Sequence, residues 1–197
     1  MTLRPDLGLV AGLIPSGSRV LDLGCGSGEL LAELIAEHGC RGTGVEIDPP
    51  LVLAAISAGV PVIELDLDSE LADFADHSYD VVVLSRTVQT LHRPVEVLKH
   101  MERIGRRLIV SVPNFGYWRH RLRLLRGRMP MSREIPHAWY DTPNLRHTTL
   151  VELEELFARL GLVIEQRIVL HPTGRPLPSD RLANITGGSA VYVLRAG

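Results

Sequence analysis

Short apolar runs alternate with periodic apolar stripes along the chain, and this alternation predicts its elements. Continuous runs of Val, Leu and Ile are typical of strands covered on both faces, whereas apolar residues that recur every three to four positions indicate helices packed on one side. The runs predict strands at 19–23, 42–47, 60–65, 79–84, 107–112, 163–170 and 190–194. The stripes predict helices at 29–36, 50–58, 94–104 and 149–160.

The order of these elements predicts the fold class. Four strand–helix repeats in succession are typical of a doubly wound, mostly parallel α/β sheet with helices on both faces. The last two strands follow each other without a helix between them, so the final one is predicted to be antiparallel. A chain of 197 residues fits one domain, 1–197, around a seven-stranded sheet.

Two segments fall outside the repeating pattern. Residues 1–18 form a short lead with one or two helical turns around 7–13, which we expect to be little more than a lid. Residues 113–148 form an irregular insertion, in which apolar residues at helical spacing alternate with Arg119, Arg121, Arg123, Arg126 and Arg128. They predict a short basic amphipathic helix, followed by an aromatic-rich loop at 130–143. The basic face is either solvated or a partner surface.

Composition narrows the classes of function. The net charge is −2, which favours neither nucleic acid nor an anionic membrane as a partner. No apolar run is long enough to span a bilayer, and the first residues lack a signal-peptide core, so we expect a cytoplasmic protein. The eight histidines show no zinc-site spacing, and we assign no metal. Cys25 and Cys40 are expected to be buried thiols; a nucleophilic Cys25 beside a helix N-terminus is the alternative.

A turn with three glycines follows the first strand and is the strongest candidate for a binding site. Gly24, Gly26 and Gly28 let the backbone adopt positive φ and approach a ligand closely, at the sheet edge where ligands of such folds bind. The dinucleotide fingerprint requires a glycine where this chain has Glu29, and an acid there repels a pyrophosphate. A cationic ligand such as S-adenosylmethionine fits better. The alternative is a tight strand-to-helix turn without a ligand.

Acidic residues lie at the carboxyl ends of the next two strands. Glu46 lies twenty residues after Gly26, where it can accept both hydroxyls of an adenosine ribose, or instead cap the following helix. After the third strand, a carboxylate at Asp66 can accept from the adenine amino group while Leu67 packs on the ring. Either Asp66 or Asp68 can instead be a solvated loop acid.

Together these blocks resemble the class I S-adenosylmethionine-dependent methyltransferases, a Rossmann-like fold, and more narrowly the MetW family of methionine biosynthesis. The narrower resemblance rests on Val20-Leu-Asp-Leu-Gly-Cys-Gly, Gly44-Val-Glu-Ile-Asp-Pro, Leu84-Ser-x-Thr-x-Gln, Ser111-Val-Pro-Asn-Phe-Gly-Tyr-Trp and Trp139-Tyr-Asp-Thr-Pro-Asn. It implies that Asp22 and the turn hold the methionine part, Glu46 the ribose, and Asp66 with Leu67 the adenine. The expected cofactor-binding set is Asp22, Gly24, Cys25, Gly26, Gly28, Glu46, Ile47, Asp66, Leu67 and Ser85.

The resemblance also implies a biological role. S-adenosylmethionine or S-adenosylhomocysteine is the expected cofactor, and homoserine O-acyltransferase is the expected partner, with this chain as an accessory or regulatory subunit, either monomeric or within a hetero-oligomer. The alternative is an active methyltransferase on a small molecule or a carboxyl group. The Asn/Asp-Pro-Pro-aromatic element of nitrogen methyltransferases is absent, and Ser85-Arg86-Thr87 stands in its place. The only candidates for catalysis are weak ones after the fifth strand, namely Tyr117, His137, Trp139 and Tyr140, for which packing is the alternative.

Overall fold

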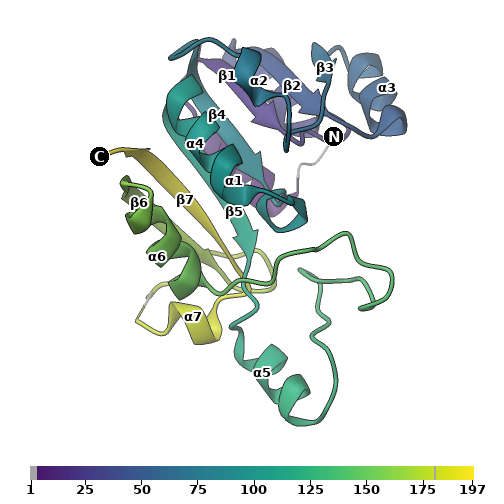
Figure 1. Cartoon of the computed structure of the whole chain (residues 1–197), viewed down its shortest axis with the longest axis vertical. Coiled ribbons are helices and arrows are strands. Elements are labelled where there is room, and N and C mark those ends of the chain that lie inside the picture. Colours follow the sequence, from purple (N-terminus) through teal and green to yellow (C-terminus); the bar gives the residue numbers. More distant parts are fainter. Residues whose placement is uncertain (1–3, 180) are drawn as a thin grey trace.

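A computed structural model describes residues 4–179 and 181–197 and shows one seven-stranded sheet (Figure 1). Its strands lie in the order β3-β2-β1-β4-β5-β7-β6. They are β1 (Arg19–Leu23), β2 (Arg41–Glu46), β3 (Val62–Glu64), β4 (Tyr79–Ser85), β5 (Gly105–Pro113), β6 (Leu162–Leu170) and β7 (Ser189–Ala196). Strands β1 to β5 pair in parallel, whereas β7 lies antiparallel between β5 and β6. The predicted mostly parallel sheet and its antiparallel last strand are confirmed.

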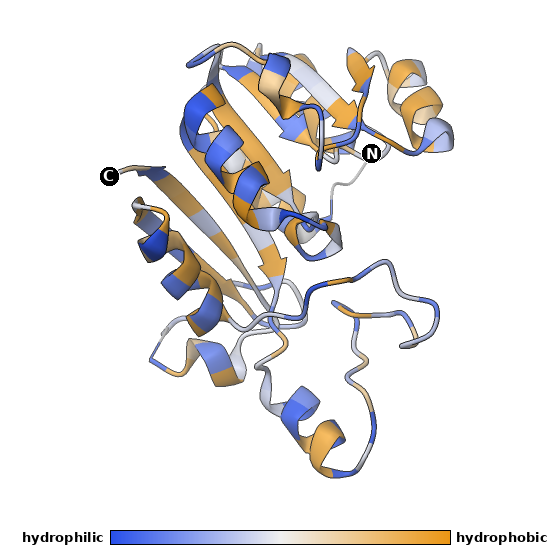
Figure 2. Ribbon diagram, viewed as in Figure 1, coloured by the Kyte–Doolittle hydropathy of each residue, from blue (hydrophilic) through white to orange (hydrophobic). Residues whose placement is uncertain are grey.

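Helices cover both faces of the sheet, and each face has its own cluster of buried apolar residues. On one face lie α4 (Pro94–Ile104) and α6 (Leu150–Arg159), and on the other lie α1 (Pro5–Leu13), α2 (Glu29–His38) and α3 (Pro49–Ser57). Figure 2 shows the outward side of α4 in blue and the strands behind it mainly in orange. The apolar side of each helix is therefore buried against the sheet. The carboxyl ends of the parallel strands are left uncovered by these helices, and ligands of such folds bind there.

Local signals explain where two of the helices begin and end. Gly28 precedes α2 and Gly39 follows it, both in the left-handed region with φ of 78° and 63°. Thr149 and Glu152 form the reciprocal hydrogen bonds of a capping box at the start of α6, as the sequence predicts. The ends of α2 are therefore set by glycines that allow positive φ, and the start of α6 is set by side-chain hydrogen bonds to the backbone.

Three expectations need correction. The segment at residues 4–18 is not a lid, because Leu7, Val10 and Ile14 of α1 are buried in the cluster that includes α2. Strand β3 is shorter than the apolar run at 60–65, since it is a partly exposed edge strand. The basic helix α5 (Trp118–Leu125) ends before Gly127, whose φ of 69° closes its last turn. The short elements η1 (Leu71–Asp73), η2 (Val88–Thr90) and α7 (Ala183–Thr186) have no clear sequence signal.

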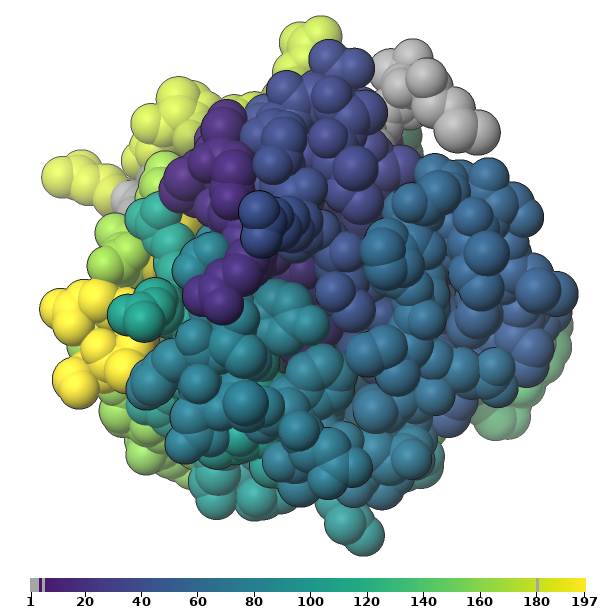
Figure 3. Space-filling view, turned by 90° about the horizontal axis from the view of Figure 1, so that it is seen from above, coloured from purple at the N-terminus to yellow at the C-terminus, as the bar shows by residue number. Residues whose placement is uncertain are grey.

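The insertion leaves the carboxyl end of β5 and projects from the body of the molecule as a lobe that carries α5 (Figure 1). Asn114 fixes its root: Nδ2 donates to the carbonyls of Asn184 and Gly187 at 3.1 and 2.9 Å, and Oδ1 accepts from the Gly116 N–H. Seen from above, the N-terminal half of the chain forms most of the visible surface, and the yellow C-terminal end lies at its margin (Figure 3). None of the helices in the described ranges combines the length and apolar character that crossing a membrane requires.

Candidate functional site

A cavity of about 400 Å³ lies beside the carboxyl ends of β1, β2 and β3. It is next to the point between β1 and β4 where the strand order reverses, the usual ligand position in such sheets. Its lining comprises Gly24, Glu46, Ile47, Leu65, Asp66, Leu67, Asp68, Thr87, Thr90, Leu91 and His92. The structure therefore brings together five residues of the expected cofactor-binding set, namely Gly24, Glu46, Ile47, Asp66 and Leu67.

The glycine turn forms one wall of this cavity. Gly24, Gly26 and Gly28 all have positive φ, at 75°, 57° and 78°. A Cβ on Gly24 would lie 2.6 Å from Thr87 Oγ1, so glycine is required there by space as well as by backbone conformation. A Cβ on Gly26 would meet nothing within 4 Å. The turn thus packs tightly against the loop after β4 at one end and faces open space in its middle.

Glu46 joins the glycine turn to the end of β2. Its Oε2 accepts from the Gly26 N–H at 2.9 Å, and its Oε1 accepts from the N–H groups of Ile47 and Asp48 at 2.8 and 3.0 Å. The side chain is buried yet borders the cavity. An ionised carboxylate offers about four acceptor positions, so Glu46 can hold the turn and still accept from a ligand hydroxyl.

The two acids after β3 have different surroundings. Asp66 accepts from the Asp68 N–H at 2.9 Å and from Ser69 Oγ at 3.1 Å, which shapes the loop at the cavity wall. Asp68 accepts from the N–H groups of His92 and Arg93 at 2.9 and 2.6 Å, just before α4. Asp68 therefore ties this loop to the start of α4.

Asp22 lies buried behind the turn, near the end of β1. Its Oδ1 has no hydrogen-bond partner in the part of the chain that the structure describes. Burial, with a smaller contribution from the negative charge of Glu46, raises the pKa of Asp22 to about 7, while Arg4 acts in the opposite direction. A buried carboxylate without a full set of partners is costly and favours a nearby cation. A ligand with an ammonium or sulfonium group fits this environment, and a phosphate does not.

The remaining members of the expected set lie outside the cavity lining. The Cys25 thiol packs over Gly44, where a Cβ would lie 2.5 Å from Sγ. Burial raises the pKa of Cys25 to about 12, so the group stays a thiol and is a poor nucleophile. Ser85 Oγ lies 3.0 Å from Ser111 Oγ and pairs with it. Gly26 and Gly28 contribute through the shape of the turn.

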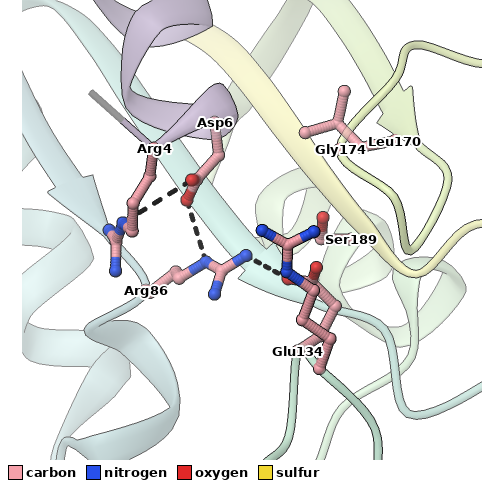
Figure 4. Close-up of a pocket in the computed structure, with 8 residues that line it drawn as sticks. Arg4, Asp6, Arg86, Glu134, Leu170, Gly174 and Ser189 are labelled. Atoms are coloured by element: carbon pink, nitrogen blue, oxygen red, sulfur yellow. Dashed lines mark hydrogen bonds and ion pairs between the residues drawn. The ribbon is translucent and has the colours of Figure 1, made fainter. Parts of the chain in front are cut away.

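A second, smaller cavity of about 160 Å³ contains charged residues that the sequence did not single out. It is lined by Arg4, Asp6, Arg86, Arg133, Glu134, Leu170, Gly174 and Ser189. Figure 4 shows Arg86 between Asp6 of α1 and Glu134 of the insertion. Arg86 Nε lies 2.9 Å from Asp6 Oδ2, and the other end of its guanidinium is paired with Glu134. Arg86 has a φ of 55°, uncommon for a residue with a side chain.

The two cavities are neighbours. Arg86 of the smaller cavity directly precedes Thr87 of the larger one, and the charge of Arg4 acts on Asp22. Burial raises the pKa of Glu134, an effect that the charge of Arg86 opposes and that of Asp6 reinforces. The smaller cavity therefore offers paired charges of both signs on the Asp22 side of the glycine turn.

None of the four weak catalytic candidates lines either of these two cavities. Tyr117 is buried at the root of the lobe, and its ring stands edge-on to His120 with centroids 5.4 Å apart. His137 and Trp139 line a separate groove of about 200 Å³ within the lobe. Tyr140 is largely exposed beside Trp139. Within residues 4–179 and 181–197, no group of three His, Cys, Asp or Glu side chains is placed to hold a metal ion.

Comparison with known proteins identifies the family. A family model described as methionine biosynthesis protein MetW matches residues 4–194. The chain belongs to the MetW family. The bifunctional methionine biosynthesis protein MetXA/MetW of Rhodopirellula baltica is 35% identical to it over 202 residues, which cover 97% of this chain and 32% of that protein. The chain thus spans about a third of that relative, and the resemblance to MetW found in the sequence is confirmed.

Methyltransferases are found among the more distant relatives and the similar solved structures. The ubiquinone biosynthesis O-methyltransferase of Aeromonas salmonicida is 27% identical over 79% of this chain and 67% of that protein. An S-adenosylmethionine-dependent methyltransferase from Mesorhizobium loti has a TM-score of 0.71 at 18% identity, covering 98% of both chains. A second one, from Thermotoga maritima, has a TM-score of 0.69 at 20% identity, covering 98% of this chain and 88% of that one. This MetW-family chain therefore has the class I methyltransferase fold.

Proposed function

We propose that this MetW-family protein binds S-adenosylmethionine or S-adenosylhomocysteine in the larger cavity and acts in methionine biosynthesis as an accessory or regulatory subunit of homoserine O-acyltransferase. The observation that carries the cofactor proposal is the pair of buried carboxylates, Asp22 and Glu46, near the ends of β1 and β2 beside a glycine turn that faces open space. The family assignment supports the pathway.

The cavity and the glycine turn beside it have separate roles in this proposal. Asp22, with the turn from Gly24 to Gly28, receives the methionine end, where its negative charge complements an ammonium group. Glu46 accepts from the ribose hydroxyls while Ile47 packs beside them. Asp66 and Leu67 face the adenine ring. When bound, S-adenosylmethionine would supply an activated methyl group, whereas S-adenosylhomocysteine has no such group.

The partner proposal is supported by the relative from Rhodopirellula baltica, whose name joins MetXA and MetW in one protein. Covalent linkage of two domains gives them a high effective concentration and is favourable where they work together. We propose that this chain makes the equivalent association non-covalently, in the cytoplasm, without nucleic acid or membrane.

Calorimetry with each cofactor and a paired activity assay test the proposal. Titration with S-adenosylmethionine and with S-adenosylhomocysteine is expected to show binding of one ligand per chain. Homoserine O-acyltransferase from the same organism is expected to gain or lose activity when the chain is added in equal amount. The absence of heat with both ligands contradicts the cofactor role, and an unchanged acyltransferase activity contradicts the accessory role.

Methyl transfer to a small polar or carboxyl-containing acceptor is the second candidate function. It is favoured by the smaller cavity, because its buried Glu134 has a raised pKa, as expected for a general base. Incubation with methyl-labelled cofactor and cell metabolites tests it. Transfer at about 1 per second or faster, in the usual enzyme range, would replace the accessory role, and its loss in Glu134→Gln would assign the base.

A further inference from the structure

The projecting lobe exposes large apolar side chains that the rest of the molecule does not cover. These side chains, here called the lobe face, are Trp118, Leu124, Leu125, Met129, Met131, Trp139 and Tyr140. Leu125 is 84% exposed, Tyr140 77% and Trp139 71%. Figure 2 shows the apolar C-terminal turn of α5 at the far end of the lobe, away from the sheet. Single exposed apolar residues are common on soluble proteins, whereas clusters of this kind mark interaction sites.

Part of the lobe face borders a groove. Met129 and Trp139 line the same groove of about 200 Å³, with Phe115 and Ile135 in its walls. Arg123 Nε donates to the Met129 carbonyl at 2.9 Å, which brings the C-terminal turn of α5 against the edge of the groove. Tyr140 stands edge-on to Trp139 with ring centroids 5.7 Å apart. A groove with aromatic residues at its rim can receive an apolar side chain of a partner, as interface hot spots do.

The surroundings of the lobe face are strongly basic. Arg119, Arg121, Arg126 and Arg128 are exposed on α5 and the turn after it, in a protein whose net charge is −2. Arg119 lies over the Trp118 ring, with its guanidinium carbon 5.3 Å from the ring centroid. Arginine and aromatic residues are enriched at protein interfaces, and a basic rim speeds association with an acidic surface.

The lobe also has little internal support. A helix of eight residues is marginal in water on its own, and residues 126–149 after it contain neither helix nor strand. A partner that covers the lobe face would bury its apolar side chains and thereby stabilise the lobe.

On these grounds we propose that the lobe face is the docking surface for the homoserine O-acyltransferase subunit, through an apolar patch with an acidic rim on that enzyme. This inference rests on the proposed function and adds the surface. The occupant follows from the Rhodopirellula baltica relative: the match covers 97% of this chain, and the other two thirds of that protein lie outside it. We therefore take the domain that is fused to the MetW part in that relative as the partner that covers the lobe face.

Dissociation constants for the purified acyltransferase from the same organism test the surface. Leu125→Glu and Trp139→Ala are each expected to weaken binding at least tenfold, because they remove apolar anchors from the contact. Arg126→Glu combined with Arg128→Glu is expected to slow association and to reduce its salt dependence. Leu53→Glu is the matched control, since Leu53 is an exposed leucine of α3 outside the lobe and both cavities, and it is expected to change binding less than twofold.

The outcomes separate this surface from the function on which it rests. Equal binding by the wild type and the lobe variants, all with unchanged circular dichroism, overturns the docking surface and leaves the association intact. No binding by the wild type overturns the association itself. Sedimentation velocity completes the test: a wild-type dimer that Leu125→Glu converts to a monomer means that a second copy of this chain occupies the lobe face, which also overturns the proposal.

Discussion

Glu46 holds the glycine turn, and in the proposed function the same carboxylate also accepts from the ribose. Replacing it by Gln removes the charge and leaves a single acceptor oxygen for the N–H groups of Gly26, Ile47 and Asp48. We expect Glu46→Gln to weaken S-adenosylmethionine binding by about 1–3 kcal/mol, the range for hydrogen bonds to a charged group. Calorimetry measures the effect. Glu64→Gln is the control, because Glu64 pairs with Glu46 in register but is exposed and outside the cavity. Equal affinity of all three proteins would place the ribose elsewhere.

Asp22 makes stability depend on pH. Its pKa in the folded protein is about 7, above the ordinary value of about 3.9. Between these values the folded protein holds a proton that the unfolded chain has released, so the contribution of Asp22 to stability falls as pH rises from 4 to 7. We expect Asp22→Asn to remove this slope, which amounts to on the order of 2–4 kcal/mol.

Urea unfolding at pH 5 and pH 8 measures this difference. Relative to the wild type, Asp22→Asn is expected to be more stable at pH 8 than at pH 5. Asp80→Asn is the contrast, because the exposed Arg19 pair lowers the pKa of Asp80 and its effect has the opposite sign. Parallel pH profiles for Asp22→Asn and the wild type would mean that Asp22 is ionised in the folded protein throughout this range.

The sequence predicts five of the residues that line the larger cavity, whereas it misses the charged cluster of the smaller one for a physical reason. Gly24, Glu46 and Asp66 each lie at or just after the carboxyl end of a parallel strand, and these ends meet at one edge of the sheet. Asp6 and Glu134 come from α1 and the irregular lobe, and only tertiary packing brings them to Arg86. The spacing of these three residues in the sequence therefore does not predict their ion pairs.

At the scale of elements, Arg86 joins α1, the end of β4 and the lobe. The Asp6 and Glu134 side chains are buried, so removing Arg86 leaves Glu134 without its ion-pair partner and leaves Asp6 with only Arg4, whose Nε lies 3.6 Å from Asp6 Oδ1. We expect Arg86→Met to lower the free energy of unfolding by about 2–4 kcal/mol, somewhat less than for a fully buried pair because Arg86 is partly exposed. Urea unfolding near pH 7 measures this change.

Arg19→Met is the control with which the loss in unfolding free energy of Arg86→Met is compared. Arg19 pairs with Asp80 on the surface, and exposed pairs contribute about 0–1 kcal/mol. A loss for Arg86→Met as small as that for Arg19→Met would show that α1 and the lobe are held in place without Arg86.

Elements with a strong period or a defined cap are those that the sequence predicts well. Strand β1 and helix α4 have the predicted bounds, and α6 begins at its capping box. The edge strand β3 and helix α5 are shorter than their apolar patterns, because each has one side without a neighbouring element to extend it. For helix α1 the sequence underestimates burial. Its apolar residues pack against α2 and the sheet, and the local sequence of α1 does not reveal these contacts.

At the scale of the whole molecule, Arg86 lies between the larger cavity and the lobe. Thr87, its neighbour, lines the cavity, while Glu134, its ion-pair partner, belongs to the lobe. A ligand can change a partner's affinity only if the two sites share a structural element that both bias. The segment from Arg86 to Thr87 connects the larger cavity to the lobe, so we expect cofactor binding and acyltransferase binding to be linked through it.

We expect the dissociation constant for S-adenosylmethionine to change at least fivefold when the acyltransferase is present at saturation, within the usual range of coupling between sites. Linkage then requires that saturating S-adenosylmethionine change the dissociation constant for the acyltransferase by the same factor. Calorimetry measures the first constant and surface-immobilised binding the second. Arg86→Met is expected to bring both factors towards one, whereas Arg19→Met leaves them unchanged. If the two ligands bind independently in the wild type, the chain supports its partner without sensing the cofactor.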